Sequence, residues 1–183
     1  MYGSSPLVLE WFISYLSDRC QRTSFENTLC DMLPVTIGVP QGSILGPLLF
    51  ILFINDLPSQ LSHSNSTMFA DDTTILTTGS SMHDLHVKLN LVANDLSAWT
   101  EQNRMAANTS KTKTMLIHSI QQLRVIPDRA LSVTLSSEEI EQVTQAKVLG
   151  VTLDSHLTWT NHIDNLCSTI NSRLHYCVGL SLS

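Results

Sequence analysis

The sequence is poor in charged residues, above all in basic ones. Only 14% of the 183 residues are charged, and ten Lys and Arg stand against sixteen Asp and Glu, which gives a formal net charge of -6. Such a chain has no broad electrostatic attraction to phosphate backbones. We therefore expect weak or no nucleic-acid binding by this chain alone, since Arg19 and Arg22 are the nearest approach to a basic cluster.

Long apolar runs are also lacking. The longest, Ile44 to Ile54, has eleven residues, whereas a helix needs about 20 to span a bilayer. The start, Met1 to Ser5, has no basic stretch before an apolar one, as a secretory signal would have. We therefore expect no membrane role. The few cysteines are expected to be free thiols rather than a twin-cysteine helical hairpin; they are Cys20, Cys30, Cys167 and Cys177.

What the sequence does contain is apolar residues in regular patterns, and at 43% of the chain they suffice for one core. Steps of three and four residues predict helices over 7–17, 44–57, 82–99 and 160–177. Alternation and β-prone composition predict a ribbon within 21–39, a hairpin of 66–69 and 73–77, and strands near 115–117 and 148–153, with a polar loop over 119–129. Helices alternating with short antiparallel strands predict an α+β fold with helices packed on one face of a sheet.

The longest predicted helix, 82–99, is expected to lie across the sheet. Its apolar face includes Leu85, Leu89 and Leu96, and such a face is typical of a helix that packs on a core. The polar residues fall elsewhere on the helix; they are Asp84, Lys88, Asn90 and Asp95. His83 and His86 lie three residues apart, and a solvated face is favoured over a zinc site there.

Two neighbouring acids, Asp71 and Asp72, lie at the break in the predicted hairpin. Adjacent carboxylates repel each other unless a positive group binds them. Mg²⁺ prefers hard oxygen ligands and takes one or two protein carboxylates together with substrate phosphates. Adjacent aspartates are also common in solvated turns. From this pair alone a solvated turn is favoured, and a divalent metal site is the alternative.

The segment Gly38 to Ser43 holds two glycines and a proline within six residues. A regular helix or a central strand tolerates this composition poorly, so we predict a loop. Ser43 is placed to cap the apolar helix that follows. Lys111, between Ser110 and Thr112, is by itself best interpreted as an ordinary surface lysine.

Three motifs follow one another along the chain. Gly38 to Phe50 reads GVPQGSILGPLLF, Ile54 to Pro58 reads INDLP, and Phe69 to Asp72 reads FADD. This combination resembles the central motifs of the reverse transcriptases of non-LTR retrotransposons. The resemblance extends over nearly the whole chain, through LEWF at Leu9–Phe12, SYL at Ser14–Leu16, Arg19, Trp99, Asn103, Asn108, Lys111–Lys113, LGV at Leu149–Val151, Leu153-Asp154 and LTW at Leu157–Trp159.

The resemblance implies a partial polymerase palm domain over 1–155 and the beginning of a thumb helix region over 156–183. Asp71 would bind a divalent metal, Mg²⁺ or Mn²⁺, in the intact parent enzyme, and Asp72 would support that site in a weaker role. Lys111 would lie near the leaving pyrophosphate. These three are the implied catalytic residues.

The same resemblance implies residues that contact the nucleotide and the nucleic acids. The nucleotide- and template-binding residues would be Gly38, Pro40, Gln41, Gly42, Ser43, Phe69 and Ala70. The primer-binding residues would be Leu149, Gly150 and Val151. The partners of the parent enzyme would be an RNA template, a DNA primer and dNTP. A nuclear location is suggested by this resemblance only.

The resemblance also implies parts that are missing from this chain. In the family, a further metal-binding aspartate and basic fingers precede the segment matched by Leu9–Phe12, but only eight residues precede it here and none is acidic. We expect the fingers and the first palm strand to be missing, which leaves an exposed sheet edge for self-association. The chain would then be either a fragment of an RNA-directed DNA polymerase or a degenerate, non-catalytic remnant acting at most as a binding or structural module.

Because a principal metal ligand is expected to be missing, we predict no measurable polymerisation by this chain alone. The measurement is primer extension with Mg²⁺ or Mn²⁺, with Asp71→Ala as the matched variant. Product that forms with the unchanged chain and disappears with Asp71→Ala would contradict this prediction.

Overall fold

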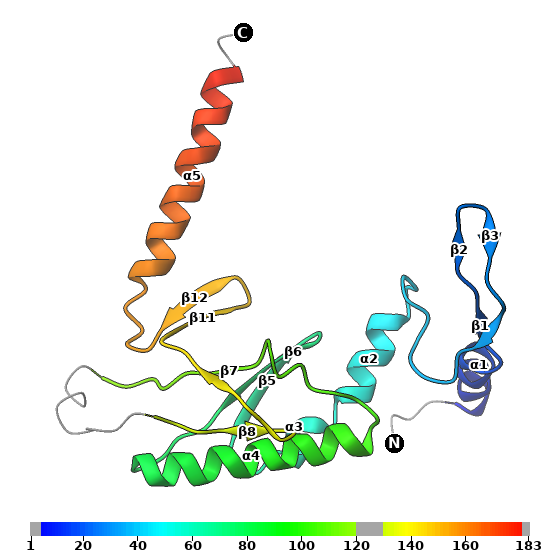
Figure 1. Cartoon of the computed structure of the whole chain (residues 1–183), viewed down its shortest axis with the longest axis horizontal. Helices are drawn as coiled ribbons and strands as arrows, with labels where there is room; N and C mark the ends of the chain where they lie inside the picture. The colour runs from blue at the N-terminus through cyan, green and yellow to red at the C-terminus, as the bar shows by residue number, and fades with distance from the viewer. Residues whose placement is uncertain (1–4, 120–129, 181–183) are drawn as a thin grey trace. The chain divides into compact units, whose positions relative to one another are not determined.

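The computed structural model of the chain describes residues 5–119 and 130–180 (Figure 1). The chain divides into two compact units, Met1–Asn55 and Asp56–Ser183. Most of the residues that the sequence singles out for chemistry lie in the second unit, while the loop Gly38 to Ser43 lies in the first.

The first unit begins with helix α1, Pro6–Leu16, close to the predicted 7–17. Proline at its first position costs no hydrogen bond, because the first N–H groups of a helix have no partner within it. The prediction of a buried face was wrong, since none of the helix's residues is buried and Trp11 is 53% exposed. Instead the ring of Trp11 stacks on Tyr15 at 5.4 Å between centroids. The apolar periodicity therefore marks a face that is at most partly buried within the first unit, at Phe12, Tyr15 and Leu16.

The predicted ribbon within 21–39 is confirmed as two short antiparallel ladders. Strand β1, Cys20–Gln21, pairs with β4, Leu33–Pro34, and β2, Ser24–Phe25, pairs with β3, Thr28–Leu29. The turn residues between β2 and β3, Glu26 and Asn27, both have positive φ values, of 44° and 62°. Tight hairpin turns require this conformation, and Asn adopts it more readily than most residues.

The helix predicted over 44–57 is divided. Helix α2 spans Gly46–Ile54 and helix α3 spans Leu57–Gln60, with Asn55 and Asp56 between them. Pro58 lies in the first turn of α3, where its missing N–H has no role to play. A continuous helix would have needed that N–H, so the proline accounts for the division.

The second unit contains the predicted hairpin and the predicted long helix. Strands β5, Asn65–Phe69, and β6, Asp72–Leu76, pair antiparallel over five residue pairs. Helix α4 spans Met82–Gln102, and its first free N–H groups are capped by Ser81, whose side chain accepts a hydrogen bond from the Asp84 N–H. Figure 1 shows α4 beneath the strands of this unit.

The core of the second unit forms between α4 and a hairpin that the sequence analysis did not identify. This hairpin consists of β8, Thr134–Leu135, and β9, Glu138–Glu139. The buried cluster comprises Ala93, Leu131, Val133, Leu135 and Ile140, with Met82, Leu85, Leu89, Leu96, Ala107 and Leu116 packed against it.

Two further strand pairs and a helix complete the unit. Strand β7, Lys113–Thr114, runs parallel to β10, Glu141–Gln142, so the strand predicted at 115–117 begins and ends earlier. Strands β11, Gln145–Val148, and β12, Val151–Asp154, replace the single strand predicted over 148–153. Helix α5 spans Thr160–Leu180, where a helix over 160–177 was predicted. The predicted loop 119–129 lies, apart from Ser119, outside the described residues.

The α+β class is confirmed, but the single sheet is not. The described strands form six separate two-stranded pairs, one of them parallel. Most of these strands are only two residues long, and a ladder so short offers little edge for a third strand. Palm, thumb and the division at residue 155 therefore stay predictions. No helix in the described ranges is long and apolar enough to cross a membrane.

Two partly buried carboxyl groups of α4 are held in the ionised form. A hydrogen bond from the backbone of Ser80, followed by the ammonium of Lys88, lowers the pKa of Asp84. Hydrogen bonds from the side chain and the backbone of Ser62 lower the pKa of Asp95. These bonds go to the charged form and therefore favour it.

A third carboxyl group belongs to Asp154, the last residue of β12 ahead of α5. Its partial burial would raise the pKa, but hydrogen bonds from the backbone and side chain of Thr158 and from the backbone of His156 outweigh burial and lower the pKa of Asp154. The carboxylate thus fixes the turn that leads into α5.

The lowered pKa of Asp154 predicts acid-sensitive folding. A carboxyl group whose pKa falls on folding stabilises the fold above its ordinary value of 3.8, and this contribution is lost as the pH falls through the lower, folded value. We expect Asp154→Asn to lower the thermal midpoint near neutral pH and to have less effect well below pH 3.8. Circular dichroism melts at several pH values measure this. Asp164→Asn, on an exposed acid of α5, is the control, and an equal pH dependence of both variants would contradict the assignment.

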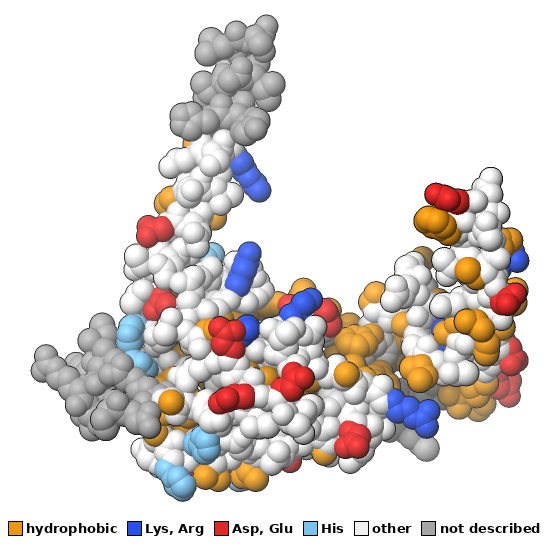
Figure 2. All heavy atoms as spheres, viewed as in Figure 1, with side chains coloured by type: hydrophobic (Ala, Val, Ile, Leu, Met, Phe, Trp, Pro, Cys, Tyr) orange, Lys and Arg blue, Asp and Glu red, His pale blue; other side chains and the backbone are white. Residues whose placement is uncertain are grey.

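Self-association is the second prediction from the fold. Exposed apolar side chains crowd the first unit (Figure 2), and neither outer edge of the β5–β6 pair meets another strand among the described residues. Both features favour pairing with a second copy. We expect concentration-dependent oligomers in analytical ultracentrifugation; a monodisperse monomer that melts cooperatively would contradict this.

Candidate functional site

The acids Asp71 and Asp72 lie at the tip of the β5–β6 hairpin. Phe69 pairs with Asp72, so the turn consists of Ala70 and Asp71 alone. Ala70 has φ +51°, a conformation that a side chain disfavours but that two-residue hairpin turns require. The tight turn places both carboxylates at the end of the hairpin, and both residues are exposed.

The two faces of this hairpin differ in burial. Residues directly paired across an antiparallel ladder point to the same face. Phe69 and Asp72 therefore share one face, and both are exposed. Met68 and Ile75 point to the opposite face and are partly buried. The hairpin thus packs one face inward and presents Asp72 on the open face.

The donor set at the tip suits a hard divalent cation. Asp71 and Asp72 supply carboxylate oxygens, and neither carboxylate accepts a hydrogen bond or forms an ion pair within the described part of the chain. Mg²⁺ takes one or two protein carboxylates and leaves its other positions to water and phosphate oxygens. Across the described ranges, no group of three or more His, Cys, Asp or Glu side chains forms a complete protein cage for a metal, including around His83 and His86. The tip therefore fits an open site that is shared with a ligand.

The loop Gly38 to Ser43 is confirmed as irregular backbone in the first unit. Gly38 and Gly42 have φ values of +79° and +76°, which explains why glycine stands at both positions. The guanidinium of Arg19 donates to the Gly38 carbonyl at 2.5 Å and to the Leu16 carbonyl at 3.0 Å. Arg19 therefore holds the start of this loop against the end of α1, where the sequence suggested part of a basic cluster.

The prediction that Ser43 caps α2 was wrong in position, because Leu45 is the N-cap residue of this helix and Ser43 lies two residues before it. The Ser43 Oγ accepts a hydrogen bond from the Gly46 N–H at 3.0 Å. Pro40 and Gln41 complete the loop; Pro40 is half-buried and Gln41 is exposed.

Lys111 lies in a tight turn after α4. The side chain of Asn108 accepts hydrogen bonds from the Lys111 N–H and from Ser110, and the Asn108 carbonyl accepts one from the Thr112 N–H. The Lys111 side chain is exposed, whereas Lys113 forms an ion pair with Glu141. Lys111 is thus available to an anion, and Lys113 is used to join β7 to β10.

Leu149 and Gly150 form the turn of the β11–β12 hairpin. Their φ values are +48° and +85°, and Val148 pairs directly with Val151. The predicted primer-binding residues therefore occupy one hairpin tip, and the predicted metal ligands occupy another. No hydrogen bond or ion pair of the described residues joins Lys111 to either tip.

The sequence analysis did not predict the hydrogen bonds that Asp56 and Asp95 form. Asp56 Oδ1 accepts a hydrogen bond from the buried indole of Trp99 at 3.2 Å, and the Asp95 carboxylate accepts two from Ser62, at 2.9 Å and 2.5 Å. Asp56 belongs to the INDLP motif and Trp99 to the downstream matches, so the motifs were recognised but this pairing was not. Only the folded chain brings them together.

Comparison with known proteins agrees with this arrangement of motifs. The family described as reverse transcriptase (RNA-dependent DNA polymerase) matches residues 4–153. The chain is 30% identical over 82% of its length to the probable RNA-directed DNA polymerase from transposon BS of Drosophila melanogaster, and 30% identical over 89% to that of the X-element. It is 27% identical over 88% to the polymerase of the mobile element jockey of the same species. No solved structure matches it significantly.

The chain therefore belongs to the reverse transcriptase family. Its relatives are RNA-directed DNA polymerases of non-LTR retrotransposons, as the sequence motifs predicted, and it corresponds to part of that polymerase domain. It spans 17% to 18% of the length of these three relatives.

Proposed function

We propose that this chain is the metal-binding palm segment of an RNA-directed DNA polymerase, and that Asp71 is its principal metal ligand. The observation that carries the proposal is the pair of exposed carboxylates at the β5–β6 tip, which no described cation neutralises. Adjacent acids on an outward-facing turn suit an Mg²⁺ or Mn²⁺ that also contacts phosphate oxygens.

Bound divalent ions would supply charge neutralisation for phosphoryl transfer at this tip. The chain's own residues have separate tasks. Asp71, in the turn, would be the principal ligand, and Asp72, on the open face, would support it. Phe69 shares that open face and would line the site beside Ala70.

The remaining predicted residues fit contacts to nucleic acid and nucleotide. Gly38 and Gly42 adopt positive φ values and carry no side chains, so a template base or dNTP can approach the loop backbone closely at two points. The Leu149-Gly150-Val151 turn would hold the primer strand. The exposed ammonium of Lys111 would stabilise the departing pyrophosphate.

The partners of the whole enzyme would be an RNA template, a DNA primer and dNTP. The net charge of -6 gives this chain little attraction to any of them. We propose that nucleic-acid binding depends on other parts of a longer polymerase. The alternative, a non-catalytic remnant, would keep the fold of the hairpin without a selective metal site.

The metal site is tested by titrating Mn²⁺ into isotopically labelled protein and recording paramagnetic broadening of amide signals by NMR. We expect broadening to begin at the hairpin tip, from Phe69 to Thr73, because the ion is held there. Asp71→Ala should abolish this selective broadening, and Asp72→Ala should weaken it by a smaller factor.

A matched control is the other acidic hairpin, which carries Glu138 and Glu139. The carboxylates of these residues already accept hydrogen bonds, from Thr109 and Ser132. Glu138→Ala should leave the broadening at Asp71 unchanged. Equal broadening of both hairpins would show only general attraction of the cation to acidic surface, and the proposal would fail.

A further inference from the structure

Helix α4 presents three different faces along its length. Residues four or seven apart lie on the same side of a helix with about 3.6 residues per turn. One face carries the residues packed on the core cluster, among them Leu85, Leu89 and Ala93. A second, exposed face carries His83, Val87, Leu91, Asn94 and Glu101. The third carries Asp84, Lys88, Val92, Asp95 and Trp99, all partly or fully buried.

This third face, the anchor face, differs from what the sequence indicated. Asp84, Lys88 and Asp95 were expected merely to fall away from the apolar face. Instead each is at least partly buried and each bonds to the chain on one side of the β5–β6 hairpin. Val92, which is 4% exposed, lies on the same face between a first group, Asp84 and Lys88, and a second group, Asp95 and Trp99.

Asp95 and Trp99 hold the chain that leads into β5. The Asp95 carboxylate accepts hydrogen bonds from both the N–H and the hydroxyl of Ser62, three residues before β5 begins at Asn65. One turn further along α4, Trp99 donates to Asp56 at the start of α3. Both ends of the short α3 segment are thus fixed to α4.

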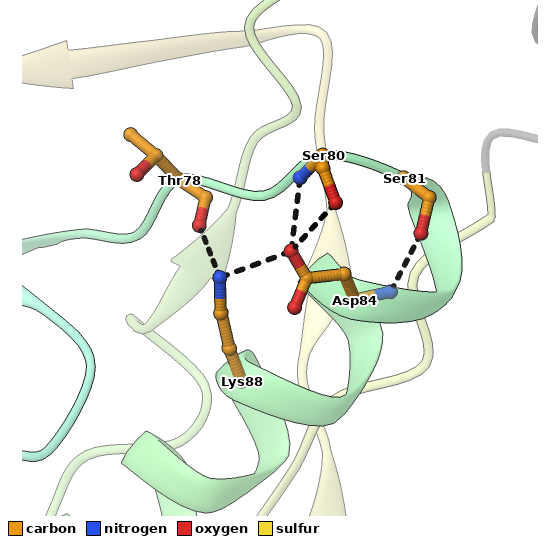
Figure 3. Close-up of polar contacts among 5 residues, drawn as sticks. All are labelled: Thr78, Ser80, Ser81, Asp84 and Lys88. Carbon is orange, nitrogen blue, oxygen red and sulfur yellow. Dashed lines mark hydrogen bonds and ion pairs between the residues drawn. The ribbon is translucent and has the colours of Figure 1, made fainter.

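Asp84 and Lys88 hold the chain that leaves β6 (Figure 3). The Lys88 ammonium donates to the Thr78 carbonyl at 3.1 Å and contacts the Asp84 carboxylate at 3.0 Å. The same carboxylate accepts hydrogen bonds from the N–H of Ser80 at 2.9 Å and from its hydroxyl at 3.3 Å. The bonded segment therefore begins at Thr78, two residues after β6 ends at Leu76.

These two groups of α4 residues, the anchors, hold the two chain ends of one hairpin. Asn65 and Leu76, the first and last residues of the hairpin, pair with each other. Lys88 and Asp95 lie seven residues apart, which is about 10 Å along a helix. The hairpin is thus held at both of its chain ends by charged groups on one rigid helix, while its tip is unbonded.

We propose that Asp84, Lys88 and Asp95 are positioning residues that orient the Asp71–Asp72 tip for metal binding. This rests on the proposed function, because orientation matters only if the tip holds an ion. None of the three touches the tip; each acts through the two strands of the hairpin. A site shared with a ligand needs such support, because displaced ligands bind metal less tightly.

Hydrogen exchange tests the anchors without any metal. Asp95→Ala and Lys88→Met should each increase amide exchange of β5 and β6 by about tenfold, since losing a charge-assisted hydrogen bond shifts a local opening by about that factor. Exchange of β8 and β9 on the apolar face should stay unchanged. Asp95→Asn keeps an acceptor oxygen for Ser62 and should restore most of the protection. Glu101→Ala, on the exposed face of the same helix, is the matched control.

Faster exchange spread equally over β5, β6, β8 and β9 would mean that Asp95 and Lys88 merely stabilise the unit, and it would overturn the proposal. Failure of Asp95→Asn to restore protection would also count against it.

Mn²⁺ binding provides the second readout, at a temperature where circular dichroism shows every variant folded. We expect Asp95→Ala and Lys88→Met to weaken Mn²⁺ binding at the tip about tenfold, at the low end of what losing an outer partner of a metal site costs. Glu101→Ala should leave the affinity unchanged. Faster hairpin exchange with unaltered Mn²⁺ affinity would overturn the positioning role. If the unchanged chain binds no Mn²⁺ at the tip, the proposed function fails and this positioning role fails with it, while the exchange data still report the anchors separately.

Discussion

The need to keep two neighbouring carboxylates in water is the constraint on which the β5–β6 hairpin depends. Asp71 and Asp72 lie in and beside a two-residue turn, too close for both charges to be stable in a dry interior. The turn must therefore point outward. The strands that carry it must bury enough apolar side chains on their other face to keep it in that orientation. The partly buried Met68 and Ile75 supply the inward face. A cation at the tip would relieve the repulsion that the fold leaves in place.

Helix α4 supports this outward orientation, because each of its three faces contacts a different partner. One face closes the apolar cluster around Leu135, and another meets solvent. The anchor face joins the chain before β5 and the chain after β6. Unlike apolar packing, hydrogen bonds to carboxylates such as Asp95 are directional and fix an orientation as well as a position. The long helix therefore packs against the core and also bonds to both chain ends of the acidic hairpin.

The sequence predicted elements with strong local signals and missed those that depend on distant partners. The hairpin at Asp71, the helix from Met82 and the glycine loop are set by periodicity and turn chemistry, and the structure has all three. The β8–β9 hairpin was overlooked, although Leu131, Val133 and Leu135 alternate with polar residues ahead of a Ser-Ser turn.

Other features had no local signal. The bonds of Asp95 to Ser62 and of Trp99 to Asp56 join residues 33 and 43 positions apart, so no short pattern indicates them. The expected burial of α1 failed for a related reason, because periodicity marks an apolar face without showing what covers it. The family was recognisable because its motifs follow one another in a fixed order, which needs no folded partner.

In the proposed function, the β5–β6 tip holds a divalent ion through Asp71. Crystals of the chain soaked in Mn²⁺ and measured for anomalous scattering test it most directly. We expect the strongest anomalous peak at coordination distance, about 2 Å, from a carboxylate oxygen of Asp71. A strongest peak at other acids, with the Asp71 carboxylate bonded only to water, would contradict it.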